Sequence, residues 1–502
     1  MGKKTSGFDL ALPSRDAKIP AYLWLYNAVR AEILEGRLRP GSRLPATRDL
    51  ATQYRLSRGT IVNAFEQLKS EGYVQGTVGS GTFVTKVLPQ DLMKVRKDVL
   101  SRQDATGKAH RRHVSAYAKR VKPLVGYDQR RFKAFRANVP ALDLFPIDLW
   151  TQLTARRLRS STASFLLGCD SSGYRPFREA IADYLNASRG VNCTANEVVI
   201  VSGMQEALDL AARLFVDPGD KVAIEDPGYG GAYAAFAAAG AKISSAHLDH
   251  EGVCLQQAAL GGTRLIYVTP AHQFPLGTTM TLCRRLDLLK WARKTGAMIF
   301  EDDYDSEYRY RGRPIPALKG LDCTGQVIFA GSLSKVLFPA LRLGYMVVAP
   351  DLVERLAATK SVSSQHASLL EQSVLCDFMT EGHFARHIRR MREVYSERLQ
   401  LLLEESRTHL KGLLEASSIE AGLQTMGWLC DGIDGLTASR AALERGVEAV
   451  PLSKYVRSCF TREGLQLGFA AIDGAEIRRG IQELAIALEQ IHRGRQKQKH
   501  AS

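Results

Sequence analysis

The sequence predicts an α/β protein in two parts: a small helical head, and a larger domain with a mainly parallel sheet that ends in a smaller C-terminal α/β subdomain. Three observations support this prediction. At 502 residues the chain is too long for a single hydrophobic core. Residues 18–87 show helical apolar spacing followed by a glycine-rich hairpin pattern. From residue 136 onward, short apolar strands alternate with helices, as in parallel sheets covered on both faces.

The composition is that of a globular protein, but the charge is unevenly distributed. Apolar residues make up 45% of the chain and charged residues 24%. Of the net charge of +16, residues 1–88 contribute +6 and residues 94–133 contribute +10. Positive charge at one end of the chain indicates that the N-terminal part meets an anionic polymer. A solvated basic linker is the alternative interpretation.

The sequence shows no targeting or metal-binding pattern. No apolar run reaches the length of a transmembrane helix, and the N-terminus lacks the apolar core of a signal peptide. The eight cysteines stand singly, with no Cys/His spacing typical of a metal site. We therefore expect reduced thiols in a cytoplasmic protein with no membrane segment and no metal site.

Residues 18–87 are expected to form a winged helix-turn-helix. A first helical pattern ends at a glycine, a short helix follows Pro45, and Ser57 caps a longer helix with Ile61 on its inner face. Two helices joined by a turn of about three residues fit a helix-turn-helix whose second helix reads DNA. The stretch "YVQGTVGSGTFV" then predicts two strands around a glycine-rich turn. A small helical bundle with surface arginines is the alternative.

The exposed start of the longer helix is the predicted contact with DNA. Its backbone N–H groups favour phosphate, Arg48 and Arg58 offer bidentate contacts, and Gly59 leaves room for close approach. In "PGSRLPATRDLA", "LSRGTI" and "EGYVQGTVGSGTFV" the segment resembles the winged helix-turn-helix of GntR-type bacterial transcription regulators. The resemblance implies that DNA is contacted by Arg48, Ser57, Arg58, Thr60, Gly79 and Ser80.

A basic linker is expected over residues 88–135. This stretch is dense in Lys, Arg and His and poor in apolar residues. We expect a largely flexible connection, helical in part, that adds salt-sensitive attraction to DNA. Its length lets the two domains sit apart or reach a partner subunit.

In the larger domain, the residues that carry chemistry fall where strands end. The predicted strands are "EVVIVSG", "KVAIEDPGY", "RLIYVTP", "MIFEDDYD", "QVIFAGS" and "LGYMVVA". Asp302 and Tyr304 lie two residues apart at one strand end, so their side chains should share a pocket. Lys335 and Arg342 follow the next strand, in an apolar stretch where such residues need partners. The helix after "EVVIVSG" offers its N-terminus to a phosphate.

A carboxylate, a lysine amine and a phosphate cradle suggest pyridoxal 5′-phosphate (PLP) bound to Lys335 as a Schiff base. Asp302 would pair with the pyridinium N–H, Tyr304 would donate to the ring hydroxylate, and Tyr229 would stack on the ring. The phosphate would be neutralised by Arg342, Ser332, Ser334 and the amides of Met204 and Gln205. Taken singly, each residue also fits an ordinary structural role, such as a surface lysine, a capping aspartate or a core tyrosine.

The ordered series "SGMQEALDLAARL", "EDPGY", "TPAHQFPLG", "EDDYDSEYRY" and "GSLSKVLFPALRLGY" resembles the fold type I PLP-dependent aminotransferases over more than half of the chain. Together with the head, the whole chain resembles the MocR subfamily, regulators in which an aminotransferase-like domain senses amines through PLP. The resemblance implies an effector domain over residues 136–492. It also implies a homodimer whose two heads read half-sites of double-stranded operator DNA.

Two positions near the expected cofactor depart from the aminotransferase pattern. Phe274 stands where aminotransferases place an asparagine against the ring oxygen, and Gln273 or His272 would be the stand-in. The stretch "HQFP" is itself typical of the MocR pattern. Gly168 stands where many relatives place a tyrosine, two residues before an aspartate.

A third departure concerns the substrate carboxylate. Gln466 stands where aminotransferases place the arginine that binds this group, which would remove a bidentate, charge-assisted pair. Arg457 and Arg462 are the nearby candidates to replace it. Ordinary transamination of amino acids is therefore not expected beyond a residual activity.

The leading hypothesis is a PLP-dependent transcription regulator that senses an amine or amino-acid-type effector, or PLP itself, through the Lys335 aldimine. A working aminotransferase fused to a DNA-binding head is the first alternative. A sensor of PLP that controls vitamin B6 synthesis is the second, and it would not need a carboxylate-binding arginine. The effector, the operator and the direction of regulation stay open at this point.

Overall fold

The computed structural model describes most of the chain, in two compact units. The described residues are 12–13, 18–77, 81–87, 113–122, 133–256, 260–312, 315–430, 432–458 and 460–501. The first unit spans residues 1–113 and the second residues 114–502, and each is considered by itself. The domain limits placed at 18–87, 88–135 and 136–492 stay predictions. Within the described residues, no helix is long and apolar enough to cross a membrane.

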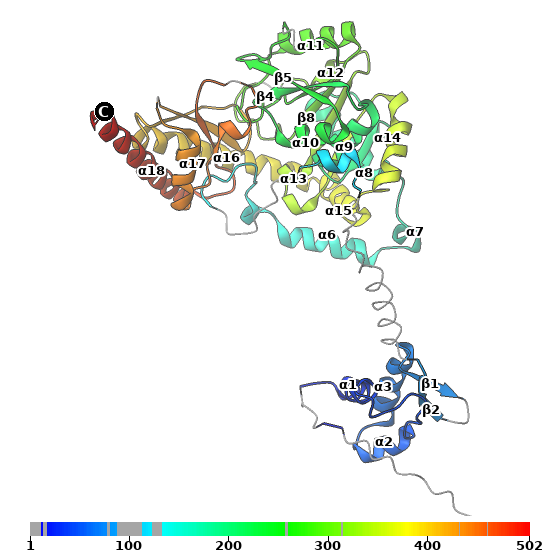
Figure 1. Ribbon diagram of the computed structural model, residues 1–502. Coiled ribbons are helices and arrows are strands. Elements are labelled where there is room, and N and C mark those ends of the chain that lie inside the picture. Colours follow the sequence, from blue (N-terminus) through cyan, green and yellow to red (C-terminus); the bar gives the residue numbers. More distant parts are fainter. Residues whose placement is uncertain are drawn as a thin grey trace, which may run out of the picture. The chain divides into compact units, whose positions relative to one another are not determined.

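The first unit is a winged helix-turn-helix, as the sequence predicts (Figure 1). Its elements are α1 (Ala21–Leu34), α2 (Thr47–Gln53), α3 (Arg58–Ser70), β1 (Val74–Thr77) and β2 (Gly81–Val84). The two strands pair in antiparallel register, and the helices enclose a core in which Leu25, Leu50 and Ile61 are fully buried. α3 begins where Ser57 Oγ accepts a hydrogen bond from the Thr60 N–H at 3.1 Å, which is the predicted N-cap.

The second unit is built on an eight-stranded, mainly parallel sheet with the order β3–β10–β9–β8–β7–β4–β5–β6 (Figure 1). Its strands are β3 (Val198–Val201), β4 (Lys221–Asp226), β5 (Lys242–Asp249), β6 (Gly252–Val253), β7 (Thr263–Val268), β8 (Met298–Asp303), β9 (Val327–Ser332) and β10 (Gly344–Val347). β10 is antiparallel to both β3 and β9, and β6 is antiparallel to β5. The other neighbouring pairs are parallel, so the carboxyl ends of β3, β4, β7, β8 and β9 meet at one edge.

Helices cover both faces of this sheet. The helices of the larger subdomain are α6 (Ile147–Arg159), α7 (Ala163–Leu166), α8 (Arg175–Arg189), α9 (Met204–Phe215), α10 (Gly230–Ala239), α11 (Leu282–Thr295), α12 (Leu318–Leu321), α14 (Pro350–Ser363) and α15 (Leu369–Thr380). α9, α10 and α14 pack on the face that includes Val199 and Val201, whereas α8 and α15 pack on the face that includes Val198 and Ile200. Burial on both faces explains why β3 is apolar at every position.

The C-terminal subdomain carries a smaller antiparallel sheet with the order β11–β12–β14–β13. Its elements are β11 (Leu414–Ala416), β12 (Gln424–Leu429), β13 (Val450–Pro451), β14 (Gly464–Gly468), α16 (His383–His409), α17 (Gly435–Glu444) and α18 (Gly474–Ala501). Side chains of α16 and α18 bury this sheet, and their apolar cluster continues into the larger subdomain. The two subdomains therefore share a continuous core.

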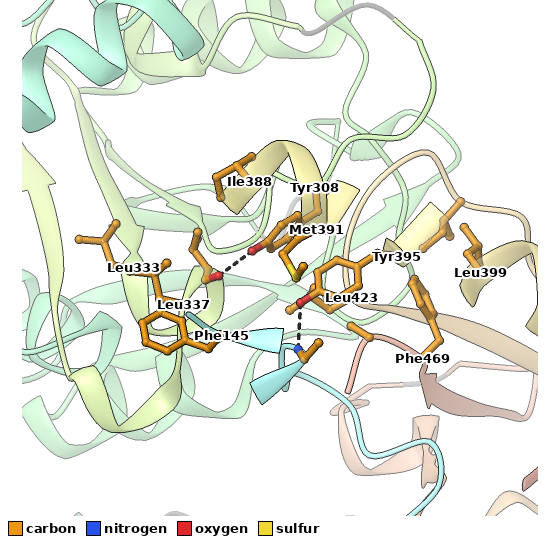
Figure 2. Packing of buried hydrophobic residues seen from close by; sticks show 14 of the residues in the cluster. Phe145, Tyr308, Leu333, Leu337, Ile388, Met391, Tyr395, Leu399, Leu423 and Phe469 are labelled. Atoms are coloured by element: carbon orange, nitrogen blue, oxygen red, sulfur yellow. Dashed lines mark hydrogen bonds between the residues drawn. The ribbon is translucent and has the colours of Figure 1, made fainter. Parts of the chain in front are cut away.

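A tyrosine of that shared core, Tyr308, holds the short helix α13 (Leu333–Val336), which follows β9. Figure 2 shows Tyr308 and Tyr395 among the packed side chains, close to Leu337. The Tyr308 hydroxyl donates to the Val336 carbonyl at 2.6 Å, and the Ala141 N–H donates to the Tyr395 hydroxyl at 2.9 Å. The remaining short elements are α5 (Ala116–Arg120) and the 3₁₀ turns Leu142–Leu144, Pro339–Leu341 and Leu452–Lys454. α13 is therefore anchored to the core at its carboxyl end.

Candidate functional site

The strand ends bring most of the predicted cofactor residues into one pocket. Its described lining residues are Asn138, Met204, Tyr229, Tyr267, Phe274, Asp302, Tyr304, Ser332 and Lys335. Asp302 comes from β8, Ser332 from the end of β9, and Lys335 from α13 directly after it. These residues meet because parallel strands present their carboxyl ends at the same edge of a sheet, where ligands of open α/β sheets bind.

The Lys335 amine is the only cationic group among the described lining residues. Its Nζ donates a hydrogen bond to the Asn138 carbonyl oxygen at 3.1 Å. Burial lowers the pKa of Lys335 to about 8, and the charges of Asp305 and Asp302 only partly offset this. A lysine with a depressed pKa has a larger neutral fraction at physiological pH, which suits attack on an aldehyde.

One carboxylate oxygen of Asp302 accepts a hydrogen bond from the protein, and the other accepts none from the described residues. Its Oδ2 accepts a hydrogen bond from the Tyr267 hydroxyl at 2.6 Å. Its Oδ1 is buried and has no hydrogen-bond partner among the described residues. Burial raises the pKa of Asp302 to about 7, although the bond from Tyr267 acts in the opposite direction. The free oxygen is suited to accept a ring N–H from a ligand.

Tyr304 is backed by a buried histidine. Its hydroxyl lies 3.0 Å from His272 Nδ1, which lies 3.0 Å from Asp305 Oδ2. His272 is therefore placed behind Tyr304, and it is not among the described residues of the pocket wall. The aromatic ring of Phe274 lines the pocket. It meets the rings of Tyr229 and Tyr304 edge-on, with ring centroids 5.8 and 6.1 Å apart.

Gln273 is directed away from the pocket. Its Nε2 donates to Glu225 Oε2 at 3.2 Å and to the Pro227 carbonyl at 3.0 Å, and its Oε1 accepts from the Leu276 N–H at 3.1 Å. The Glu225 carboxyl is fully buried, and this burial raises its pKa to about 7. Gln273 thus completes a buried polar cluster below the pocket, and the structure does not bring it to the predicted cofactor position.

The predicted phosphate cradle lies at the start of α9. Gly203 precedes this helix with φ +101°, and a Cβ at this position would lie 3.6 Å from Arg342 Cζ. Ser334 Oγ is buried without a hydrogen-bond partner among the described residues. The Gln205 side chain donates to the Gly231 carbonyl at 3.1 Å, so only its backbone amide is suited to the cradle. Helix N–H groups, a guanidinium and a hydroxyl without a partner form a donor set that matches a phosphate.

The pocket therefore fits PLP on features of this chain. Asp302 Oδ1 and Ser334 Oγ are buried polar atoms without partners, and such atoms are unusual unless a ligand or water satisfies them. Asp302 lines the pocket together with Lys335, and Ser334 directly precedes Lys335 in α13. Tyr229 adds an aromatic ring on the wall.

Sequence reasoning missed two residues of this pocket. Asn138 precedes every predicted strand of the larger domain and lies 197 positions from Lys335, whose amine donates to its carbonyl. It has φ +63°, and no local pattern identified it. Tyr267 lies in β7, and a tyrosine next to the carboxyl end of that strand was the signal that could have found it.

The residues near the missing carboxylate arginine are engaged elsewhere. Gln466 lies in β14, fully buried, and its Oε1 accepts from the Tyr455 hydroxyl at 2.8 Å. The Arg457 guanidinium lies over the Tyr233 ring at 3.5 Å. The Arg462 guanidinium lies 4.5 Å from the centroid of the Trp428 ring and pairs with Glu415 at 3.5 Å. Neither arginine is among the described residues that line the pocket.

Gly168 has a backbone that disfavours any side chain. Its φ is +107°, and a Cβ would lie 2.6 Å from His366 Nε2. A tyrosine at this position would therefore be strained as well as crowded. The departure from the aminotransferase pattern is thus built into the local backbone.

Most of the predicted DNA-contacting residues lie on the surface of the first unit. Arg48, Ser57 and Arg58 are exposed, and Thr60 is half-buried with its hydroxyl 2.8 Å from Ser57 Oγ. Gly79 and Ser80 lie outside the described residues. The start of α3 thus presents two hydroxyls and a guanidinium at a helix N-terminus.

Comparison with known proteins identifies both parts of the chain. The family described as bacterial regulatory proteins, gntR family, matches residues 21–84, and the family aminotransferase class I and II matches residues 135–482. The probable rhizopine catabolism regulatory protein MocR of Rhizobium meliloti is 39% identical over 475 residues, 94% of each chain. The HTH-type pyridoxine biosynthesis transcriptional regulator PdxR of Corynebacterium glutamicum is 26% identical, over 95% of this chain and 97% of that protein.

A solved structure matches the second unit. It is LysN, the α-aminoadipate aminotransferase from Thermus thermophilus, complexed with N-(5′-phosphopyridoxyl)-L-leucine. The TM-score is 0.68 at 28% sequence identity, and the match covers 75% of this chain and 97% of LysN. Its crystal thus contains a phosphopyridoxyl compound in a fold similar to that of the second unit.

Proposed function

Because this chain belongs to the MocR subfamily of GntR-type transcription regulators, we propose that an amine effector binds at the Lys335 pocket and changes how the head engages operator DNA. The protein is a PLP-binding transcription regulator with DNA as a partner. Such a response requires that the effector bind two states of the protein with different affinity. The aminotransferase fold is usually dimeric, so the proposal includes a homodimer. It also places this homodimer in the cytoplasm.

The described residues provide a partner for each part of the cofactor. Lys335 would hold it as a Schiff base, and Asp302 Oδ1 would accept the ring N–H. The Tyr304 hydroxyl would meet the ring oxygen, and Tyr229 would cover one face of the ring. The phosphate would be held by Arg342, Ser332, Ser334 and the amides that begin α9. When bound, PLP supplies an aldehyde carbon that a primary amine can attack and a ring that withdraws electrons.

The observation that carries the proposal is that Lys335 lines the same pocket as Asp302, whose Oδ1 is buried without a hydrogen-bond partner among the described residues. The lowered pKa of Lys335 keeps part of its amine neutral. Tyr267 holds the Asp302 carboxylate so that its other oxygen faces the ligand. A carboxylate at this position keeps a proton on the ring nitrogen, because an opposite charge stabilises the protonated form.

PLP itself is the second candidate effector. Gln466 stands at the sequence position where aminotransferases place the carboxylate-binding arginine, and a sensor of free PLP needs no such cation. One relative is named as a regulator of pyridoxine biosynthesis. An amine-responsive regulator and a PLP sensor predict different responses to added amines.

Genome-wide mapping of the bound DNA would supply the operator for the test. The purified PLP-loaded protein is then titrated with amines while its visible absorption and its operator affinity are followed. We expect both to change together. Lys335→Ala should lose the visible band and the amine response but keep operator binding. Arg58→Ala should keep the band and weaken operator binding by roughly 1–3 kcal/mol.

The other outcomes separate the alternatives. A response to added PLP without any amine effect would favour the PLP sensor. Steady turnover of an amino donor with a keto acid would establish an enzyme. An amine response that survives Lys335→Ala would contradict the proposed site.

A further inference from the structure

The residues around the pocket also indicate which polar groups the effector carries besides its amino group. We propose that the effector is a primary amine that bears a neutral hydroxyl or carbonyl oxygen in place of a carboxylate next to the amino group, and that Gln466 receives this oxygen. This inference rests on the proposed function, because it concerns the pole of the ligand opposite the amine bound at Lys335.

The first step is the distribution of positive charge. Lys335 is the only cation among the described lining residues, and its amine is committed to the cofactor. Arg342 lies beside Gly203 at the start of α9, where the phosphate would lie. Arg136, near the pocket residue Asn138, lies 3.7 Å from Glu448. The described pocket therefore offers no guanidinium for a second anionic group besides the phosphate.

The second step is the orientation of two buried glutamines. β12 and β14 are antiparallel, with Gln424 opposite Gly468 and Met426 opposite Gln466. Side chains of directly opposed residues, and of residues two apart, point to the same face of a sheet. Gln424 and Gln466 therefore lie on one face of the small sheet, and 1% or less of each residue is exposed.

The sheet face that carries Gln424 and Gln466 is turned toward the pocket. Gln424 Oε1 accepts a hydrogen bond from the backbone N–H of Asn138, a lining residue, at 2.9 Å. Gln466 Oε1 accepts from the Tyr455 hydroxyl, and the Tyr455 ring meets the ring of Phe274, another lining residue, with centroids 5.0 Å apart. Gln424 thus contacts the wall of the pocket directly, and Gln466 supports it through Tyr455.

The side-chain NH₂ group of Gln466 has no acceptor among the described residues. With its oxygen bonded to Tyr455, its Nε2 group is buried and has no hydrogen-bond partner among the described residues. A buried N–H donor without a partner is unfavourable and points to an acceptor supplied by a ligand. An amide donor is sufficient for a hydroxyl or carbonyl oxygen. A carboxylate would lose its hydration here without a cation in exchange.

The test uses matched ligands that differ only in the carboxylate. Serine is compared with serinol, and glucosaminic acid with glucosaminitol, on the PLP-loaded full-length protein. Binding is followed by visible absorption, by calorimetry and by operator affinity. We expect the amino alcohols to bind more tightly than the amino acids by about tenfold or more, and Gln466→Arg to reverse this preference. Gln466→Met, which keeps the bulk without the amide, should weaken amino-alcohol binding and keep the cofactor band.

Each outcome is informative. A wild-type preference for the amino acids, or equal binding of both, would overturn this inference and leave an amine-responsive regulator standing. No binding of any of the four ligands, with the cofactor band and operator binding intact, would also overturn it and favour the PLP sensor. Absence of the cofactor band would remove the proposed function as well. If Gln466→Arg does not fold, the wild-type comparison decides alone.

Discussion

At the scale of single residues, the pocket depends on a pair of buried groups that fix each other. The Tyr267 hydroxyl donates to one oxygen of Asp302 and leaves the other for a ligand. Without this donor, a carboxyl at this depth would be protonated more readily, because burial already raises its pKa to about 7. Tyr267 is therefore a positioning residue that acts through Asp302.

Replacing Tyr267 with phenylalanine tests this pair. Tyr267→Phe removes the bond that lowers the pKa of Asp302, so the pKa should rise further and PLP should bind more weakly by roughly ten- to hundredfold. The loss should be largest below about pH 7, where Asp302 would be protonated. Absorption titrations with PLP at several pH values measure it. Tyr184→Phe removes the analogous bond to Glu307, outside the pocket, and should leave PLP affinity unchanged.

The lowered pKa of Lys335 predicts how the rate of PLP association depends on pH. Its amine must be neutral to attack the aldehyde, and its pKa lies at about 8. The rate of PLP association should therefore rise by roughly tenfold per pH unit below about 8 and level off above it. Stopped-flow absorption measures this profile. With Nα-acetyl-lysine amide as the control, the rate of reaction with PLP should continue to rise toward about pH 10. The same late rise of the rate in the protein would show that the pKa of Lys335 is not lowered.

At the scale of elements, the start of α9 depends on a backbone that only glycine adopts easily. Gly203 has φ +101° and ψ 177°, a region that is essentially restricted to glycine. This conformation turns the chain from the end of β3 into the helix and leaves the Arg342 guanidinium next to the first turn. The proposed phosphate cradle thus combines a strand end, a helix start and Arg342, which lies two residues before β10.

Gly203→Ala tests whether this geometry serves the phosphate. The added Cβ would cost roughly 1–3 kcal/mol in backbone strain. It would also lie 3.6 Å from Arg342 Cζ, in the space between the guanidinium and the helix start. We expect weaker binding of PLP with little change for pyridoxal, which lacks the phosphate. Gly219→Ala is the matched control, because φ is +104° there and nothing lies within 4 Å of the added Cβ. It should lower stability in guanidinium unfolding without affecting PLP, and equal losses in both variants would refute a role in the cradle.

At the scale of the whole molecule, sequence reasoning predicted what depends on local pattern. Asp302, Tyr304 and Lys335 were placed together because the period of a strand and the common edge of parallel strands are regular features. Asn138 was missed because its contact with Lys335 is made across 197 positions of sequence. Gln273 was expected at the cofactor, but the buried carboxyl of Glu225 attracts its amide. Local patterns therefore identify strand ends, while tertiary neighbours decide side-chain direction.

The charge distribution leads to a prediction that concerns the molecule as a whole. Residues 94–133 hold most of the net charge of the chain, with 13 Lys/Arg against 3 Asp. If these cations contact phosphates, each one neutralised should reduce the salt dependence of DNA binding by about 0.9 in the log–log slope. Replacing Lys94, Arg96 and Lys97 with glutamine should therefore reduce the slope by up to roughly 2.7, equally for operator and random DNA.

A matched triple substitution separates this effect from net charge alone. Lys290, Arg293 and Lys294 are exposed on α11 of the second unit, and replacing them with glutamine changes the net charge by the same amount. Fluorescence anisotropy over a range of salt concentrations measures both variants against the wild type. A reduced slope in the first variant only would place DNA phosphates at the basic stretch. Equal slopes in all three proteins would mean that Lys94, Arg96 and Lys97 do not contact DNA phosphates, because counterion release reports only the charges that meet phosphate.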